Sequence, residues 1–439
     1  MLSVLSNRTY RHLFMAQSIA LIGTGLATVA LGLLAYDLAG ENAGAVLGTA
    51  LTIKMIAYVG VGPIASAVAD KIPRRRMLVV LDLVRAAVAL LLPFVTEIWQ
   101  VYVLIFLLQS ASAAFTPAFQ ATIPDILPDE KEYTRALSLS RLAYDMESLV
   151  SPMLAAALLT IVSFHNLFAG TVIGFLASAA LVVSVTLPRS TASASRGFYD
   201  RITRGMRIYL ATPRLRGLLA INMAVAAAGA VVIVNTVVYV QTVFGFGNRE
   251  TALALAAFGA GSMLVALGLP KVLDRVSDRS VMVIGAALLA IASGLSATLQ
   301  SYAWLIALWF LIGTGYSLAQ TPAGRILRRS SHAEDRPAVF AAQFALSHAC
   351  WMVTYPLAGW AGVFFGLPVA SIILATIAGC ATLAAAWFWP FPDEEMVEHS
   401  HEGLPSHHPH WEQGTAKRRN SHTHVFVIDD LHATWPHFK

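Results

Sequence analysis

Residues 62–76 read G-P-I-A-S-A-V-A-D-K-I-P-R-R-R, a short charged stretch between two long apolar segments. Its charges begin at Asp70 and end at Arg76. Lysine and arginine in short loops between membrane spans are retained on the cytoplasmic side during insertion. The stretch therefore predicts two flanking transmembrane helices whose ends here face the cytoplasm.

The composition of the whole chain also indicates a membrane protein. Of its 439 residues, 57% are hydrophobic and 13% are charged, whereas soluble domains carry about 25% charged residues. The formal net charge of +5 does not indicate nucleic-acid binding, because the basic residues fall in loops between apolar segments. Cys350 and Cys380 both lie in apolar segments, which excludes a disulfide framework.

Twelve apolar stretches are long enough to cross a membrane, which takes about 20 residues of helix. In lipid the backbone must satisfy its own hydrogen bonds, so stretches of this length are expected to be helices. They are residues 13–36, 45–69, 77–95, 99–119, 140–162, 166–187, 217–241, 251–273, 281–299, 302–323, 339–364 and 368–389. The sequence thus predicts an all-α membrane protein with twelve transmembrane helices.

The distribution of basic residues orients these helices. The loops on the side of residues 70–76 hold nearly all the lysines and arginines, and the loops on the other side hold only Arg249. This asymmetry and the even number of spans predict that both termini are cytoplasmic. We expect a multi-pass protein of a bacterial inner membrane.

Three landmarks recur at a nearly constant offset. Asp70-Lys71 returns as Asp274-Arg275, Thr116-Pro117 as Thr321-Pro322 and Pro152 as Pro356, at offsets of 204, 205 and 204 residues. A fixed offset between corresponding spans predicts two pseudo-repeated six-helix halves.

The loop at residues 62–76 resembles the loop between the second and third spans of the major facilitator superfamily. Gly62, Ala65, Asp70, Lys71, Arg74 and Arg75 match, while Pro73 and Ser66 replace glycines. The resemblance implies a conformational latch between the two halves, formed by Gly62, Asp70, Lys71, Arg74 and Arg75. The alternative is a loop that only sets topology.

We divide the chain into four parts. Residues 1–187 and 217–389 are the two six-helix halves, 188–216 is a cytoplasmic linker and 390–439 is a histidine-rich cytoplasmic tail. In the linker, Phe198, Ile202, Met206 and Tyr209 recur at helical spacing between arginines. This pattern predicts an amphipathic helix on the inner leaflet of the membrane.

The sequence carries no signature of an enzyme. It has no phosphate-binding G-x-x-x-x-G-K-[ST] loop and no nucleophile motif, so we expect no catalytic residues and no cofactor. Polar groups inside membrane spans are costly and usually face a cavity or a partner. The functional residues are therefore sought among them.

Lys54 is the most informative of these residues. It lies about 14 Å into the second span at 1.5 Å per residue, close to the membrane middle. It either binds an anionic substrate group or exchanges protons, or it snorkels or pairs structurally.

Asp145 and Glu147, in the fifth span, are candidate proton carriers. Arg141 lies four residues before Asp145 on the same helix face, which favours a static ion pair for that carboxylate. Glu147 points elsewhere and is the preferred proton carrier. For the polar pathway between the halves we name Asn222 and Asn235 of the seventh span and His348 of the eleventh.

The tail contains nine of the thirteen histidines. Alternating histidines in an extended chain point to one side, and neutral imidazoles suit nickel, cobalt, copper or zinc. The candidate metal ligands are His399, His401, His407, His408, His410, His422 and His424. The alternative is a polar, disordered tail. Residues 425–428, followed by Asp429 and Asp430, are a candidate short strand that docks on the cytoplasmic face.

The fourth span reads F-L-L-Q-S-A-S-A-A from Phe106, where proton-coupled drug exporters of the superfamily carry an arginine. The chain is thus similar to the macrolide-efflux and siderophore-export branch. This resemblance implies a proton-coupled antiporter that exports small toxic or amphiphilic molecules by alternating access. Its expected partners are a small-molecule substrate, protons and the lipid bilayer, with no nucleic acid. The alternatives are a divalent-metal exporter that uses the tail and a membrane sensor that transports nothing.

Overall fold

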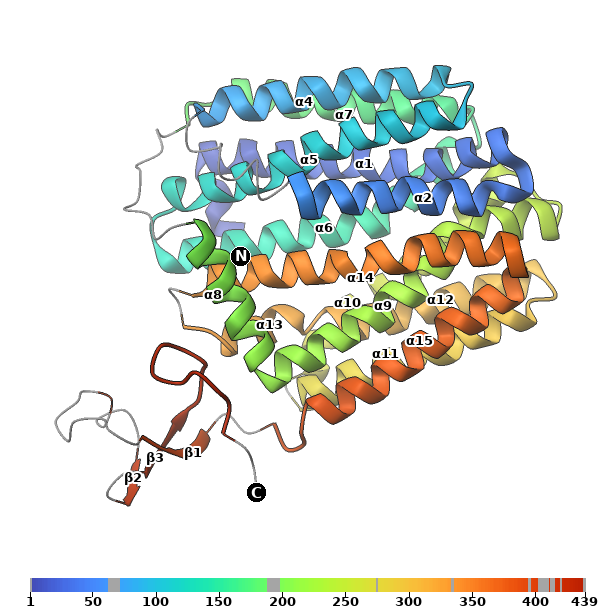
Figure 1. Cartoon of the computed structure of the whole chain (residues 1–439). Helices are drawn as coiled ribbons and strands as arrows, with labels where there is room; N and C mark the ends of the chain where they lie inside the picture. Colours follow the sequence, from blue (N-terminus) through green and yellow to red (C-terminus); the bar gives the residue numbers. More distant parts are fainter. Residues whose placement is uncertain are drawn as a thin grey trace.

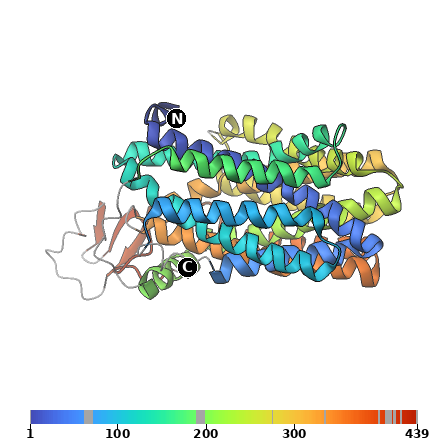
Figure 2. The same cartoon turned by 90° about the horizontal axis from the view of Figure 1, so that it is seen from above.

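In the part of the chain that the structure describes, twelve long helices form the body of the protein. The computed structural model describes residues 2–61, 72–187, 198–273, 275–332, 335–393, 396–401, 410, 415–418 and 421–436. The helices run lengthwise in two groups of six, drawn one above the other in Figure 1. Both views place the C-terminal tail at one end of the bundle (Figures 1 and 2). We call this the tail end and the opposite one the far end.

The first half contains the helices that precede the linker. Their bounds are α1 Arg8–Ala39, α2 Ala43–Ile56, α4 Arg74–Leu91, α5 Ile98–Ile126, α6 Glu130–Leu158 and α7 His165–Val183. The π-helix η3 Ala57–Val61 extends α2, and the 3-10 helices are η1 Leu2–Ser6, η2 Gly40–Asn42 and η4 Leu92–Phe94. Helix α6 begins at Glu130, before the predicted start at 140, because a helix can continue beyond the apolar segment that spans the lipid.

The second half repeats this organisation. Its helices are α9 Pro213–Val238, α10 Asn248–Val272, α11 Asp278–Leu295, α12 Tyr302–Gln320, α13 Ala323–Arg329, α14 Arg336–Phe365 and α15 Leu367–Phe388. The π-helix η5 Tyr239–Val243 extends α9, and the 3-10 helix η6 Ser296–Thr298 follows α11. At the far end, Gly40 and Gly366 end α1 and α14 with φ of 54° and 84°. Glycine adopts such angles without steric cost, which permits these tight turns.

The helices are suited to a lipid environment. Nine stretches of the described chain are long and apolar enough to cross a membrane, and one of them, Arg8–Val61, contains both α1 and α2. Helices α6 and α14 lie outside these nine; they pack between the halves, α6 against α10 and α14 against α2. Large apolar side chains such as Trp387 and Leu267 are 79% and 76% exposed, as expected where lipid replaces water.

The two halves repeat contacts as well as helices. Arg75, at the start of α4, donates to the carbonyl oxygen of Val183 at the end of α7. Arg279, 204 residues later at the start of α11, donates to the carbonyls of Ala386 and Trp389 at 3.0 and 2.6 Å. Both arginines satisfy carbonyls that lack partners at a helix C-terminus. The structure thus shows the repeat that the offset predicts.

A buried ion pair joins three helices of the first half. Asp82 and Arg85 of α4 are 0% and 4% exposed and form a salt bridge. Ser178 of α7 donates to the second Asp82 oxygen at 2.7 Å. The Arg85 guanidinium lies 4.1 Å from the ring centroid of Phe115 and 4.5 Å from that of Phe175. The pair therefore anchors α4 against α5 and α7.

The linker contains the helix α8 Phe198–Ala211. Its buried Tyr209 donates a hydrogen bond to Gln343 of α14. A Cβ atom on Gly205 would lie 2.2 Å from the carbonyl oxygen of Ala338, so the two backbones are in close contact. The sequence predicted that the apolar face of α8 lies on the inner leaflet of the membrane. That expectation is wrong for Tyr209, which packs against α14.

The tail folds into a three-stranded antiparallel sheet. Its strands are β1 Met396–Ser400, β2 Thr415–Arg418 and β3 Ser421–Val425, in the order β1-β3-β2. His399 pairs with His422, and Val397 with His424. The expected strand at 425–428 is wrong in its bounds, because β3 ends at Val425 and the buried Phe426, Val427 and Ile428 follow it.

The tail is held against the tail end of the bundle. Asp430 accepts hydrogen bonds from Arg204 at 3.0 Å and from Arg207 at 3.3 Å. Arg204 also binds Asp335, which precedes α14, at 2.5 Å. The hydrogen bond from Arg204 lowers the pKa of Asp430. The ion pairs therefore connect the tail to both α8 and the start of α14.

Candidate functional site

Lys54 lies in the last turn of α2, just before the π-helix η3. Its Nζ atom is 5.9 Å from the ring centroid of Tyr58, one turn further along. Such an arrangement over an aromatic ring attracts a cation, more strongly where water is excluded. The side chain is partly buried, so the tertiary structure holds the ammonium group inside the bundle.

Glu147 and His348, from distant parts of the chain, lie within electrostatic range of Lys54. Glu147 lies on α6 and His348 on α14, and each interacts electrostatically with Lys54. His348 Nδ1 lies 2.7 Å from the carbonyl oxygen of Phe344. Since a carbonyl only accepts, Nδ1 carries the hydrogen and Nε2 presents its lone pair. Lys54 thus interacts with one titratable residue from each half.

Aromatic side chains line one side of these charges. The Tyr58 ring stacks on His348 at 5.2 Å and lies 5.8 Å from Phe344. Glu147 also interacts electrostatically with Tyr355, which is 7% exposed. The sequence analysis missed Tyr58 and Phe344, although each lies one helical turn from a residue that it named. We call Lys54, Tyr58, Glu147, His348 and Tyr355 the central cluster.

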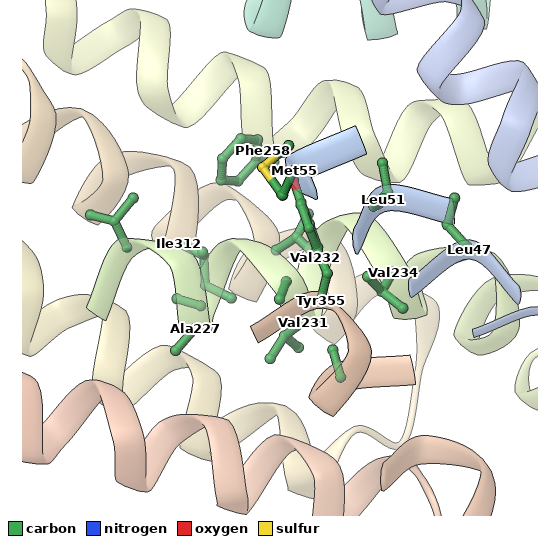
Figure 3. Close-up of a cluster of buried hydrophobic side chains, with 14 of the residues drawn as sticks. Leu47, Leu51, Met55, Ala227, Val231, Val232, Val234, Phe258, Ile312 and Tyr355 are labelled. Carbon is green, nitrogen blue, oxygen red and sulfur yellow. The ribbon is translucent and has the colours of Figure 1, made fainter. Parts of the chain in front are cut away.

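Apolar side chains lie beside the central cluster. Figure 3 shows Leu47, Leu51 and Met55 of α2 together with the valines of α9 and with Tyr355. The three α2 residues are spaced four apart, which places them on one face of the helix. These side chains belong to one buried apolar cluster, to which α2 of the first half and α9 of the second both contribute.

The two predicted asparagines have different surroundings. Asn222 accepts a hydrogen bond from Gln320 of α12 at 3.0 Å and donates to Leu218 at 2.8 Å, so it joins two helices of one half. Asn235 is fully buried, and its amide has no partner among the described residues. A Cβ atom on Gly44 would lie 3.2 Å from its Oδ1. Among the described residues, no hydrogen bond joins either asparagine to Lys54, and their roles stay predictions.

Some predicted site residues lie outside the described part of the chain. These are Gly62, Asp70 and Lys71 of the latch, and the side chain of Asp145. Of the remaining latch residues, Arg74 forms a salt bridge with Asp125 of α5. Asp278 and Arg325 form the corresponding pair in the second half at 3.5 Å, with the charges reversed. The described contacts of Arg74 and Arg75 thus join helices within the first half.

The two halves are in contact at the far end. Thr242 of η5 donates to the hydroxyl of Tyr36 of α1 at 3.1 Å. Trp360 of α14 donates from its indole nitrogen to Thr49 of α2 at 3.3 Å. A Cβ atom on Gly359 would lie only 2.2 Å from the carbonyl oxygen of Gly44. Helices α2 and α14 can therefore approach closely only because glycines face each other.

We expect Gly359→Leu to hold the far end open. The added side chain would cost about 1–3 kcal/mol in the closed state, which shifts the balance of states by roughly 5- to 150-fold. The measurement is labelling of Thr49→Cys by a membrane-impermeant maleimide, with Cys350 and Cys380 replaced by serine. The matched control is Gly379→Leu, because a Cβ atom there meets nothing within 4 Å. Equal labelling in both variants would contradict the prediction.

The tail brings five of its seven predicted histidines to one place. The Nε2 atoms of His401 and His410 are 2.9 Å apart, and those of His399 and His422 are 3.0 Å apart. His424 lies 3.3 Å from His410, also through Nε2. His407 and His408 lie outside the described residues. Burial lowers the pKa of His399, His410 and His422 to about 4, so their imidazoles are neutral at pH 7.

His432 is a sixth member that the sequence analysis missed. It is 5% exposed, and its Nε2 lies 3.0 Å from that of His399. The residue stands alone in the sequence, eight positions after His424. Only the turn after β3, in which Asp429 binds its Nδ1 at 2.8 Å, returns it to the other histidines.

Comparison with known proteins identifies the family. The Major Facilitator Superfamily model matches residues 13–276 and 218–428. Macrolide efflux protein A of Enterococcus faecalis is 24% identical over 189 residues, which is 40% of this chain and 58% of that protein. Macrolide efflux protein A of Streptococcus pyogenes is 25% identical over 185 residues, 40% of this chain and 45% of that protein. The chain thus spans about half the length of these relatives.

A longer match reaches YvqJ of Bacillus subtilis (strain 168), named an uncharacterized MFS-type transporter. It is 24% identical over 379 residues, 82% of this chain and 87% of that protein. Among solved structures, a bacterial homolog of the human lysosomal transporter Spinster, inward-facing and unoccupied, has a TM-score of 0.69 at 13% identity. The match covers 87% of this chain and 97% of that one. The nucleoside transporter NupG has a TM-score of 0.66 at 13% identity, with 87% and 99% covered. The family match over both halves, together with the twelve-helix fold, shows that this chain is a multi-pass membrane protein that belongs to the Major Facilitator Superfamily.

Proposed function

We propose that this protein exports small toxic or amphiphilic molecules from a bacterial cytoplasm, by alternating access and at the expense of the proton gradient. The observation that carries the proposal is the central cluster. A carboxylate of the first half and a histidine of the second half both interact electrostatically with the same lysine. In transporters of this architecture, sites between the halves are exposed alternately to the two sides of the membrane.

Glu147 is the proposed proton carrier. When it is ionised, it attracts the ammonium group of Lys54. A proton on Glu147 removes this attraction and leaves Lys54 beside the ring of Tyr58. The Tyr58 ring stacks on His348 of the other half, so the proton changes the charge at the contact between the halves. This link couples proton movement to the rocking of the halves.

The aromatic side of the cluster is the proposed surface for the exported molecule. Tyr58, Phe344 and His348 offer stacked rings next to one cation and one carboxylate. Flat aromatic faces with few charged groups suit amphiphilic molecules of varied shape. The two relatives named macrolide efflux protein A support an organic substrate of this class.

The orientation follows from the loops. The basic residues gather at the tail end, which we assign to the cytoplasm with both termini, in a bacterial inner membrane. The closed far end is then the outer side. In this orientation the predicted latch operates when the tail end closes. Arg74 and Arg75 belong to it.

Growth of cells on a panel of compounds tests the proposed function. Cells would express the intact chain or a chain that ends at Asp393, and would be exposed to macrolides, cationic dyes, nickel, cobalt and zinc. We expect resistance to organic compounds that does not depend on the tail. Resistance confined to metals and lost with the tail would instead support metal export, and no resistance with no flux would support a sensor.

A further inference from the structure

The folded tail gathers six histidine side chains around one point. They come from β1, from β3 and from the segments next to them, and all approach the point with Nε2. The six residues are His399, His401, His410, His422, His424 and His432. Their ligand atoms form two overlapping groups of four in which all atoms lie within 4.8 Å of one another. We call these six residues the histidine cluster.

The rings of the histidine cluster are arranged as an octahedron. His399 and His410 are opposite each other, with ring centroids 6.1 Å apart. Each of the other four lies 4.6–4.9 Å from both of them. Around the equator, successive centroids are 4.8–5.4 Å apart, in the order His401, His432, His424, His422. Two axial and four equatorial positions are the arrangement of six ligands around one ion.

Hydrogen bonds fix the direction of three imidazoles. His399 Nδ1 lies 3.1 Å from the carbonyl oxygen of Val397, and His424 Nδ1 lies 2.7 Å from that of Val425. His432 Nδ1 contacts Asp429 at 2.8 Å. In the neutral ring a donating Nδ1 leaves Nε2 with a lone pair, as in histidines that bind metals.

These tautomers make the cluster unfavourable without a cation. The Nε2 atoms of His399 and His432 are 3.0 Å apart, and the Nδ1 atom of each ring has its own acceptor. Two lone pairs at this distance repel each other unless a positive charge lies between them. A proton can bridge one such pair, whereas six Nε2 atoms that converge on one point fit a bound metal ion.

The spacing distinguishes six-coordinate from four-coordinate binding. With metal–nitrogen bonds of about 2.1 Å, adjacent ligand atoms are about 3.0 Å apart in an octahedron and about 3.4 Å in a tetrahedron. The four Nε2 pairs are 2.9–3.3 Å apart, and six nitrogens are present rather than four. Zinc sites are mostly four-coordinate, whereas imidazole also suits nickel.

We propose that the tail binds one divalent transition-metal ion of the nickel class, in six-coordinate geometry, through the Nε2 atoms of the histidine cluster. The site goes beyond the proposed export activity and does not depend on it. Asp429 connects the site to the transporter, because one of its oxygens contacts His432 and the other lies 3.4 Å from His332, before α14. Its neighbour Asp430 binds Arg204 of α8. A filled site therefore stabilises the tail in its docked position.

Metal binding by the full chain tests the proposal. The protein would be purified in detergent with a tag that contains no histidine and titrated with nickel chloride. We expect one nickel ion per chain with an affinity tighter than about 1 µM. X-ray absorption should show six nitrogen neighbours at about 2.1 Å, and cobalt should give the weak absorption of an octahedral complex. Weaker binding, or a four-coordinate spectrum, would overturn the six-histidine site.

Variants locate the ion. His399→Ala combined with His410→Ala removes both axial ligands and should abolish tight binding. His12→Ala combined with His165→Ala changes two histidines outside the tail and should leave tight nickel binding unchanged. Asp429→Ala keeps all six ligands and should weaken binding by about 10- to 100-fold at unchanged stoichiometry, since it removes an outer partner. Tight binding that survives loss of the axial pair would refute the assignment.

Discussion

Glu147→Gln is expected to abolish proton-coupled export while the protein remains in the membrane at its normal level. Glutamine has nearly the same shape but cannot ionise, so it cannot take up or release the proton. It also removes the charge that interacts with Lys54. Export driven by an inward proton gradient should fall at least about tenfold, which corresponds to about 1.4 kcal/mol of coupling. The dependence of export on pH should disappear with it.

The measurement is substrate flux in proteoliposomes at several imposed pH gradients. Glu132→Gln is the matched control, because it makes the same change on the same helix, near the tail end. Lys54→Leu should also reduce transport, since it removes the partner of Glu147. Unchanged pH dependence in Glu147→Gln would remove that residue from the site, and unchanged transport in Lys54→Leu would do the same for the lysine.

Asp82→Ala should have the largest effect on stability. Both members of the Asp82–Arg85 pair are buried, and Arg85 lies between the rings of Phe115 and Phe175. Removing the carboxylate leaves a buried guanidinium without its main counter-charge. The loss of one partner from such a pair typically costs about 3–5 kcal/mol.

Unfolding in detergent, induced by heat or by denaturant, measures this loss of stability. Asp37→Ala is the control, because Asp37 is exposed at the end of α1 and its loss should cost within about 0.5 kcal/mol. The double variant Asp82→Leu with Arg85→Met should recover much of the stability, since a well-packed apolar pair can replace a buried ion pair. An Asp82→Ala variant as stable as the Asp37 control would show that the pair does not anchor α4.

The sequence predicted the membrane helices well because their signal is local. Twenty consecutive apolar residues require a helix in lipid, whatever the rest of the chain does. The predicted stretch 302–323 begins where α12 begins at Tyr302, and 339–364 lies within α14 Arg336–Phe365. Errors occurred where the helix leaves the lipid, as at the start of α6.

The candidate site was predicted only residue by residue. Lys54, Glu147 and His348 were each selected because a polar group inside a span is costly. Nothing in their spacing indicated that they interact, because the interaction depends on how the helices that carry them are arranged. The same rule also selected Asn222, which instead joins α9 to α12 through Gln320.

The sequence by itself determined the fold class, the repeat and the side on which the basic loops gather. These follow from hydropathy, from residue offsets and from charge, which act along the chain. Only the tertiary structure decided which polar residues share a site. The arrangement of the helices brings positions 147 and 348 within electrostatic range of position 54. Pairing of β1 with β3 joins His399 to His422. The turn at Asp429 then adds His432, because contacts between distant residues depend on packing and hydrogen bonding that no local pattern encodes.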